Sequence, residues 1–442
     1  MVQSPRPQGR RGRAPASPSA PSPDASAWRR PFEAGDGLRG AAALMVLLSH
    51  VVFAEQTYGA FGWTGLPGRN PATSFGENGA YAILSIGQAG LDLFLALSAY
   101  LLSRPFLAWA GSRTGRPRLR RFAVRRALRI LPAYWAACGL AVAWLVVLRS
   151  APLEPGKALP TLLLGHDFQW GWAVALEPAW SVRVEALFYL LLPLLGGLWW
   201  TAGRFGGPAG ARVAIGLTAV AAIGYPVVAS TRPGDIGISA NLWLFAPGLL
   251  VTLIESSDRV RGWTARRGVA PTLTAGALGA VLLVVALPVA FAVGKAALHG
   301  PETVLDAART QFLVQMALQA PGSALVLLAL LAREWQGAPP PLALGSAPAR
   351  WLGARSYSIY LLHYAVIGAL LPRILPGQQG GIGYVGLALA TTAVTATLAA
   401  ALFRIVELPA MRLAARITRS PPPGPLSVTD ALTPAARVTA NR

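Results

Sequence analysis

The stretch GLRGAAALMVLLSHVVFAE, residues 37–55, decides the fold class of this chain. Most of its residues are apolar, and a helix of this length, rising 1.5 Å per residue, crosses a hydrocarbon layer of about 30 Å. A run of this length and composition predicts a transmembrane helix.

Nine further apolar stretches follow along the chain, at residues 82–103, 130–149, 181–201, 212–229, 240–255, 272–293, 311–332, 352–371 and 382–406. Their apolar residues are continuous rather than alternating, which disfavours an outer-membrane β-barrel. The sequence therefore predicts an all-α, polytopic integral membrane protein with about ten transmembrane helices.

The composition agrees with a membrane protein. Of the 442 residues, 54% are hydrophobic and only 13% are charged, and the mean hydropathy is +0.47. A soluble domain carries about 25% charged residues, so a water-soluble fold is excluded. Residues 1–32 and 413–442 are rich in Pro, Ser and Ala with few apolar residues to bury, and they are predicted to be disordered tails around a membrane domain at 33–412.

The net charge of +21 would suggest nucleic acid binding in a soluble protein. Here the arginines concentrate in both tails and in alternate connectors, and this asymmetry follows the positive-inside rule. It predicts that both termini are cytoplasmic in a multi-pass plasma membrane protein, with membrane lipids rather than nucleic acid as partners. The densest connector contains Arg104, Arg113, Arg116, Arg118, Arg120, Arg121, Arg125, Arg126 and Arg129.

That connector has two interpretations. It can be an anchor beside anionic lipid headgroups. Its last three arginines, Arg125, Arg126 and Arg129, are helix neighbours that enter the membrane, and such a cluster can also hold a polyphosphate through charge-assisted hydrogen bonds.

Ionisable residues inside the spans are costly and are candidates for function. Arg39 and His50 are eleven residues apart, which places them on one helix face about 16 Å from each other. Arg39 would lie at the cytoplasmic mouth and His50 beyond the midplane. The alternative is a positive-inside arginine and a histidine that only packs between helices.

Three more ionisable residues lie in later spans. Asp92 is expected near the outer side, either as a functional carboxylate or as a helix cap, and Glu185 is expected to find a partner on another helix rather than Arg183. His363 shares one face with Ser356 and Tyr360 at a depth similar to that of His50.

Two histidines and a carboxylate at one depth can form a general base with an orienting carboxylate, a proton path or a metal site. The metal site is the weakest of these, because no two ligands share a helix with His-Glu-x-x-His spacing, and no metal is expected. His166 and His299 are expected in solvated outer loops.

Six motifs, taken in order, resemble the membrane-bound acyltransferase 3 family from about Arg30 to Arg412. They are the pair Arg39 and His50, Gly90-Leu91-Asp92-Leu93-Phe94, the basic segment from Arg126 to Tyr134, Trp180-Ser181 with Glu185, Phe188 and Tyr189, the segment from Ser356 to His363, and Glu407-Leu408-Pro409. Ala99 and Ala186 depart from the family pattern, and neither receives a role.

The resemblance implies transfer of an acyl group, expected to be acetyl, from cytoplasmic acyl-CoA to a hydroxyl of a glycan, lipid-linked sugar or secondary metabolite. His50 would be the general base or the first acceptor of the acyl group, oriented by Glu185 or Asp92 and supported by His363. The CoA phosphates would face four arginines: Arg39, Arg125, Arg126 and Arg129. The alternative from another class is a proton-coupled exporter in which His50, Glu185 and His363 relay protons.

Overall fold

The computed structural model describes residues 32–60, 72–111, 119–144, 155–164, 176–229, 238–298, 304–374 and 381–418. These residues are almost entirely helical and contain no β-strand, which confirms the all-α class. His166, His299 and most of both predicted tails lie outside the described residues.

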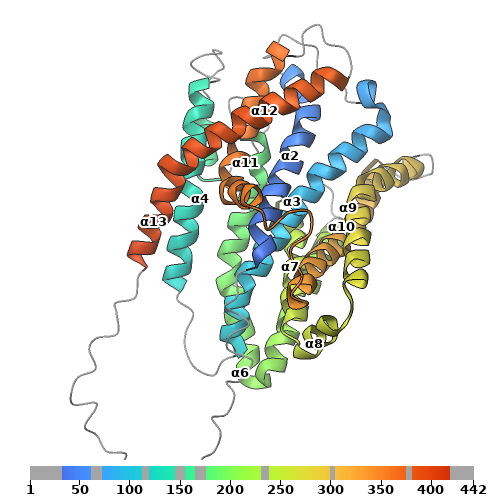
Figure 1. Cartoon of the computed structure of the whole chain (residues 1–442), viewed down its shortest axis with the longest axis vertical. Helices are drawn as coiled ribbons and strands as arrows, with labels where there is room; N and C mark the ends of the chain where they lie inside the picture. Colours follow the sequence, from blue (N-terminus) through green and yellow to red (C-terminus); the bar gives the residue numbers. More distant parts are fainter. Residues whose placement is uncertain are drawn as a thin grey trace, which may run out of the picture. The chain divides into compact units, whose positions relative to one another are not determined.

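Helix α2 (Glu33–Ala60) packs between α3 (Ala72–Gly111) and α11 (Ala347–Ile374), as Figure 1 shows. Glycines allow the close approach of these backbones. A Cβ atom on Gly353 of α11 would clash with the backbone carbonyl of Asp36, and one on Gly90 of α3 would lie 2.6 Å from the carbonyl oxygen of Ala42. The face of α2 that carries Arg39 and His50 is thereby held against two neighbouring helices.

Helix α6 (Trp180–Ala229) contains two of the predicted spans. Its two arms meet at Gly207, whose φ of 62° and ψ of −162° break the helix, and Pro208 follows. A positive φ is accessible to glycine without the steric cost that other residues incur. The bend therefore separates residues 181–201 from residues 212–229.

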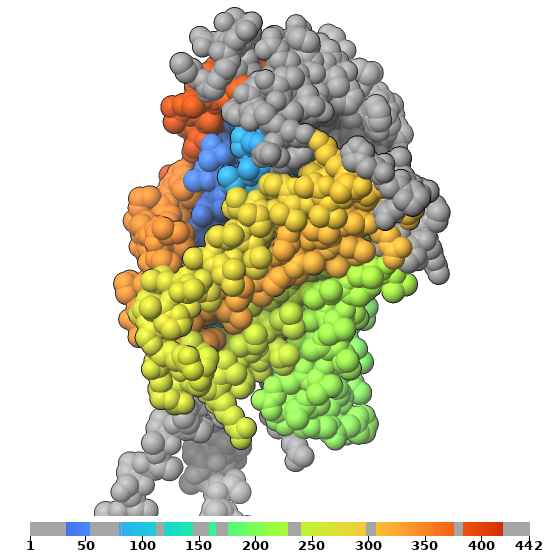
Figure 2. All heavy atoms as spheres, turned by 90° about the vertical axis from the view of Figure 1, so that its right-hand side faces the viewer, coloured from blue at the N-terminus to red at the C-terminus, as the bar shows by residue number. Residues whose placement is uncertain are grey.

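The other helices complete the membrane domain. Helices α9 (Val269–Leu298) and α10 (Val304–Trp335) lie side by side across the face seen in Figure 2. The remaining elements are α4 (Leu119–Val142), α5 (Pro155–Leu162), η3 (Ile238–Phe245), α7 (Ala246–Glu255), α8 (Asp258–Arg266), α12 (Gly381–Leu402), η4 (Phe403–Glu407) and α13 (Leu408–Ile417).

The surface and interior have the polarity expected of a protein in lipid. Large leucines face outward, with Leu190 exposed at 73% and Leu389 at 68%, whereas Asp92, Glu185 and His363 are buried. Outward apolar side chains match the surrounding hydrocarbon, and inward polar groups find partners within the bundle.

Seven described helical segments are long and apolar enough to span a membrane. The count is eight if the helices at residues 240–255 and 258–266, which are bent by 84° relative to each other, form one span. Helix α4 is not among them, because five arginines lie in its first half. The two arms of α6 count as one segment although they match two predicted spans. The multi-span architecture is confirmed, and the count of ten stays a prediction.

The structure corrects four expectations about position. Asp92 cannot cap a helix start, because α3 begins twenty residues earlier at Ala72. Arg104 lies within α3 rather than in a connector. The expected tail boundary at residue 413 falls inside α13, which continues to Ile417, and Phe32 is buried rather than part of a solvated tail.

Candidate active site

His50 of α2 and His363 of α11 are in direct contact. Their facing ring nitrogens, Nδ1 of His50 and Nε2 of His363, are 2.9 Å apart. His363 is only 1% exposed, and the ring of Tyr364 meets that of His50 edge to face at 5.2 Å between centroids. The two histidines that were expected at similar depth therefore form a hydrogen-bonded pair.

The hydrogen bonds of the pair assign its tautomers. Nδ1 of His363 lies 2.7 Å from the backbone carbonyl oxygen of Tyr360, and a carbonyl only accepts, so this nitrogen carries the proton. In the neutral pair, Nε2 of His363 accepts from the N–H at Nδ1 of His50. The remaining nitrogen of His50, Nε2, then keeps a lone pair that can accept a proton or attack an electrophile.

The two carboxylates have other partners than His50. Glu185 accepts hydrogen bonds from Ser98 at 3.1 Å and from Tyr189 at 2.5 Å. Asp92 accepts from Gln88 at 3.0 Å. Among the described residues no hydrogen bond joins either carboxylate to His50, whose hydrogen-bond partner is His363. Glu185 does have its partner on another helix, Ser98 of α3, as the sequence indicated.

All four arginines of the predicted phosphate site line one cavity of about 530 Å³. Asp36, Glu185 and Tyr189 line it as well, and the cavity is set among α2, α3, α4, α6, α11 and the segment from Phe403 to Ala415. The sequence placed Arg39 and the cluster of α4 at the same membrane face, and the structure brings them to the same cavity.

The four arginines differ in their present partners. Arg129 forms an ion pair of 2.5 Å with buried Glu407, and Arg39 lies 3.4 Å from Asp36. Arg125 donates to the Thr418 hydroxyl at 3.2 Å. The Arg126 guanidinium lies 5.6 Å from the centre of the Tyr189 ring, and its Nε is buried without a hydrogen-bond partner among the described residues.

A narrow void lies next to this cavity. It shares Phe94, Glu185 and Tyr357 with the cavity and is also lined by Ser181 and Tyr360. Along α2, Arg39 lines the cavity, Ala42, Ala43 and Val46 line the void, and His50 follows. Helix α11 repeats the order: Ala354 lines the cavity, Ser356, Tyr357 and Tyr360 line the void, and His363 follows. Along both helices, therefore, the arginine cavity comes first, the void second and the histidine pair third.

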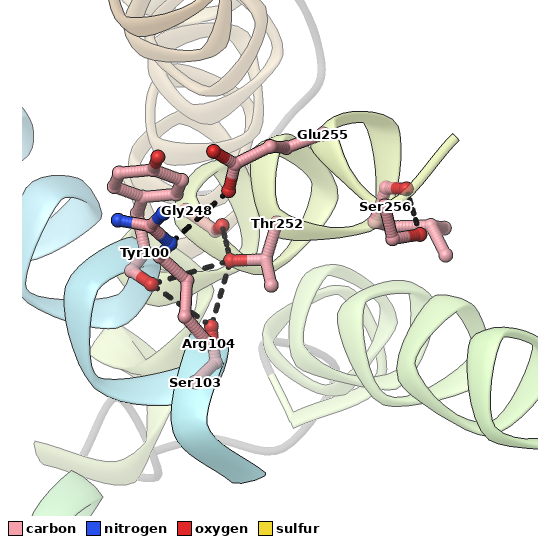
Figure 3. Close-up of polar contacts among 8 residues, drawn as sticks. Tyr100, Ser103, Arg104, Gly248, Thr252, Glu255 and Ser256 are labelled. Carbon is pink, nitrogen blue, oxygen red and sulfur yellow. Dashed lines mark hydrogen bonds and ion pairs between the residues drawn. The ribbon is translucent and has the colours of Figure 1, made fainter. Parts of the chain in front are cut away.

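A second polar cluster lies between α3 and α7 (Figure 3). Arg104 pairs with Glu255 at 3.2 Å, and the hydroxyl groups of Ser103 and Thr252 are 2.7 Å apart. Sequence reasoning missed this ion pair, although Glu255 is an ionisable residue at the end of the predicted span 240–255. It also gave no role to Glu407, which holds Arg129 and accepts from Ser358 at 2.7 Å.

Within the described ranges, no group of three or more His, Cys, Asp or Glu residues is arranged to hold a metal ion.

Comparison with known proteins identifies the class. Residues 33–404 match the family described as an acyltransferase domain, and the chain belongs to that family. Its described helices that are long and apolar enough to cross a membrane agree with a membrane-bound member of that family. This confirms the family expected from the six motifs and favours acyl transfer over the proton-coupled exporter.

One curated relative carries a specific name. The chain is 25% identical over 343 residues to the peptidoglycan O-acetyltransferase OatA of Listeria monocytogenes serovar 1/2a. The similarity covers 73% of this chain and 51% of the relative, so the chain spans about half the length of the curated relative it matches. No solved structure matches the chain.

Proposed function

We propose that this protein is an O-acetyltransferase that takes an acetyl group from acetyl-CoA and transfers it to a hydroxyl of a glycan. The observation that carries the proposal is the order of the three features along α2 and α11. Along both helices, a cavity lined by four arginines comes first, a void comes next, and the pair of His50 and His363 follows.

The arginine cavity suits the phosphates of CoA. Guanidinium groups bind phosphate oxygens through short, charge-assisted hydrogen bonds that are often bidentate. Arg39 and Arg126 are the strongest candidates, because Arg126 has no carboxylate partner among the described residues and Arg39 has only the 3.4 Å contact with Asp36. Arg129 is already neutralised by Glu407 and would position α4 against the C-terminal segment.

The chemistry uses Nε2 of His50. In one route, this nitrogen takes the proton of the acceptor hydroxyl while the hydroxyl oxygen attacks the thioester carbonyl. The carbon–sulfur bond breaks, the proton passes from His50 to the CoA sulfur, and the products are an ester and free CoA thiol. In the other route, Nε2 attacks the thioester carbonyl, the carbon–sulfur bond breaks and CoA leaves as a thiolate. The acceptor hydroxyl then takes the acyl group from the imidazole, and its proton passes to the thiolate, so the products are again an ester and free CoA thiol. Both routes require the same lone pair.

The choice of a glycan acceptor is supported by the relative, whose name states that it O-acetylates peptidoglycan. A lipid-linked sugar and a secondary metabolite are the other acceptors compatible with the family resemblance. The test should therefore offer acceptors of each kind.

The decisive experiment uses the full chain purified into lipid nanodiscs with radiolabelled acetyl-CoA. Soluble peptidoglycan fragments, a lipid-linked sugar and a buffer blank serve as acceptors, and labelled ester and free thiol are measured together. We expect ester formation on the glycan fragments and its loss in His50→Ala by about 10²–10⁴-fold, the usual contribution of a general base. Equal ester formation by the variant and the original protein at matched abundance would contradict the assignment of His50.

A further inference from the structure

The void between the arginine cavity and the histidine pair is narrow. Its volume is about 20 Å³, on a measure by which one water molecule needs about 10–15 Å³. Its walls are mostly apolar and come from α2, α3, α6 and α11. The close crossing of α2 and α3 at Gly90 keeps these walls together. The void therefore has room for a thin, unbranched group at most, and it excludes a nucleotide or a sugar ring.

One polar group in this void has no partner. The side chain of Ser356 is 1% exposed, and its hydroxyl has no hydrogen-bond partner among the described residues. Leaving a buried hydroxyl unsatisfied costs about 1–3 kcal/mol, so the Ser356 hydroxyl is free to gain a partner when a ligand group enters the void.

The other polar groups of the void are satisfied. Tyr360 donates to the backbone carbonyl of Pro178 at 2.5 Å and is 2.7 Å from the Ser181 hydroxyl, which donates to it. Glu185 accepts from Ser98 and Tyr189. Ser356 is thus the group that remains available to a chain passing through the void.

We propose that Ser356 and this void form a subsite for the amide group next to the thioester in a pantetheine-type donor arm. The Ser356 hydroxyl would donate to the amide carbonyl oxygen and so position the thioester at His50. This inference rests on the proposed function, because it assumes a thioester donor that enters from the arginine cavity. Ser356 is a positioning residue, since it acts on the arm and not on the reacting carbonyl.

The spacing along α11 fits this arrangement. Ser356 and His363 are seven residues apart, which corresponds to about 10 Å along a helix. In the arm, five bonds separate the amide carbon from the thioester carbon, roughly 6 Å at the extended spacing of about 3.5 Å per three bonds. A hydrogen bond of about 3 Å at the Ser356 end accounts for most of the remainder.

The test uses the full chain in nanodiscs and compares two small thioester donors. S-acetyl-N-acetylcysteamine contains the amide, and S-pentyl thioacetate has methylene groups in its place. Thiol release is followed with peptidoglycan fragments as the acceptor. In Ser356→Ala we expect kcat/KM for the amide donor to fall about three- to tenfold, the effect of one hydrogen bond, and kcat/KM for the pentyl donor to stay unchanged.

Ser323→Ala is the matched control, because Ser323 of α10 is equally buried and also lacks a hydrogen-bond partner among the described residues, but it does not line the void. Both variants should keep their thermal stability, since each removes a hydroxyl that contacts no protein partner.

Three results would overturn the inference. If Ser356→Ala changes kcat/KM for neither donor, the hydroxyl binds only water. If the variant loses kcat/KM equally on both donors and has a lower Tm, the hydroxyl has a structural role. Thiol release from neither donor nor from acetyl-CoA would overturn the proposed function, and this inference with it. Transfer with an unchanged ratio would leave the proposed function standing, so the two failures are distinguishable.

Discussion

At the scale of single residues, the feature that defines the candidate site is a chain of hydrogen bonds that ends on a free nitrogen. It runs from the Tyr360 carbonyl through His363 to His50. A carbonyl at one end fixes the direction of both N–H groups, so the backbone of α11 determines which nitrogen of His50 is basic. The hydrogen-bond partner of His50 is thus a second histidine.

This series of hydrogen bonds predicts different effects for two substitutions of His363. His363→Ala should lower transfer about tenfold or more, because His50 loses the acceptor that fixes its ring. His363→Asn should recover part of the rate, since an amide oxygen can accept from Nδ1 of His50. Initial rates of thiol release at saturating acetyl-CoA measure both effects. Equal rates for the two variants would show that packing, and not the hydrogen bond, is the contribution of His363.

The arginines give a second prediction. Arg39→Lys and Arg126→Lys should each raise the KM for acetyl-CoA about tenfold, because lysine cannot reproduce a planar, bidentate contact with phosphate. Acetyl-CoA titrations on the purified variants measure the change. Arg212→Lys is the control, because Arg212 is exposed on α6 and lies outside the cavity. If all three variants match the original protein, the arginines serve as membrane anchors only.

At the scale of helices, the contact between α2 and α11 determines whether the two histidines meet. The contact depends on small residues, since Gly40 of α2 faces the backbone of Ala349 and Gly353 of α11 faces that of Asp36. Without a hydrophobic force between helices in lipid, such close packing is a main source of association.

We therefore predict that Gly353→Ala destabilises the protein by about 1–3 kcal/mol, the usual cost of forcing extra atoms into a packed contact. Transfer should fall as well, because α2 and α11 must separate. Thermal unfolding in nanodiscs and the rate of thiol release measure the two effects. Gly224→Ala is the control, since a Cβ atom there meets nothing within 4 Å. A normal Tm for Gly353→Ala would contradict the close packing.

The sequence predicted the helices better than their contacts. Apolar length placed every predicted span except residues 130–149 in a helical segment apolar enough to cross a membrane, whereas the shared face of Arg39 and His50 stays a prediction from helical periodicity. The cap assigned to Asp92 was wrong because polar residues such as Thr73 and Glu77 concealed the first ten residues of α3. The contact of His50 with His363 joins positions 313 residues apart, and no local pattern in one sequence encodes such a distance.

At the scale of the whole domain, the site forms a line across the predicted membrane. The arginine cavity opens at the first turns of α2, the void follows, and the histidine pair lies about 16 Å farther along α2. A donor that enters at one end can thus meet an acceptor that approaches from the other. This arrangement can support transfer only if the arginine cavity faces the compartment that contains the donor.

The last prediction concerns that orientation. Reporter fusions after Gly111 and Arg419 should both read cytoplasmic, because arginines concentrate on this side, and a fusion after Gly156 should read external. The structure adds a reason for Gly156. Backbone carbonyls of α5 accept hydrogen bonds from Tyr134 at 2.6 Å and from Trp135 at 3.0 Å. Tyr134 and Trp135 lie more than two turns along α4 from Arg125, so α5 and Gly156 lie toward the other end of α4 from the arginines. Alkaline phosphatase and green fluorescent protein fusions in intact cells report the two compartments. A cytoplasmic signal at Gly156 would contradict the topology, and an inverted pattern at all three sites would place the arginine cavity outside, away from cytoplasmic acyl-CoA.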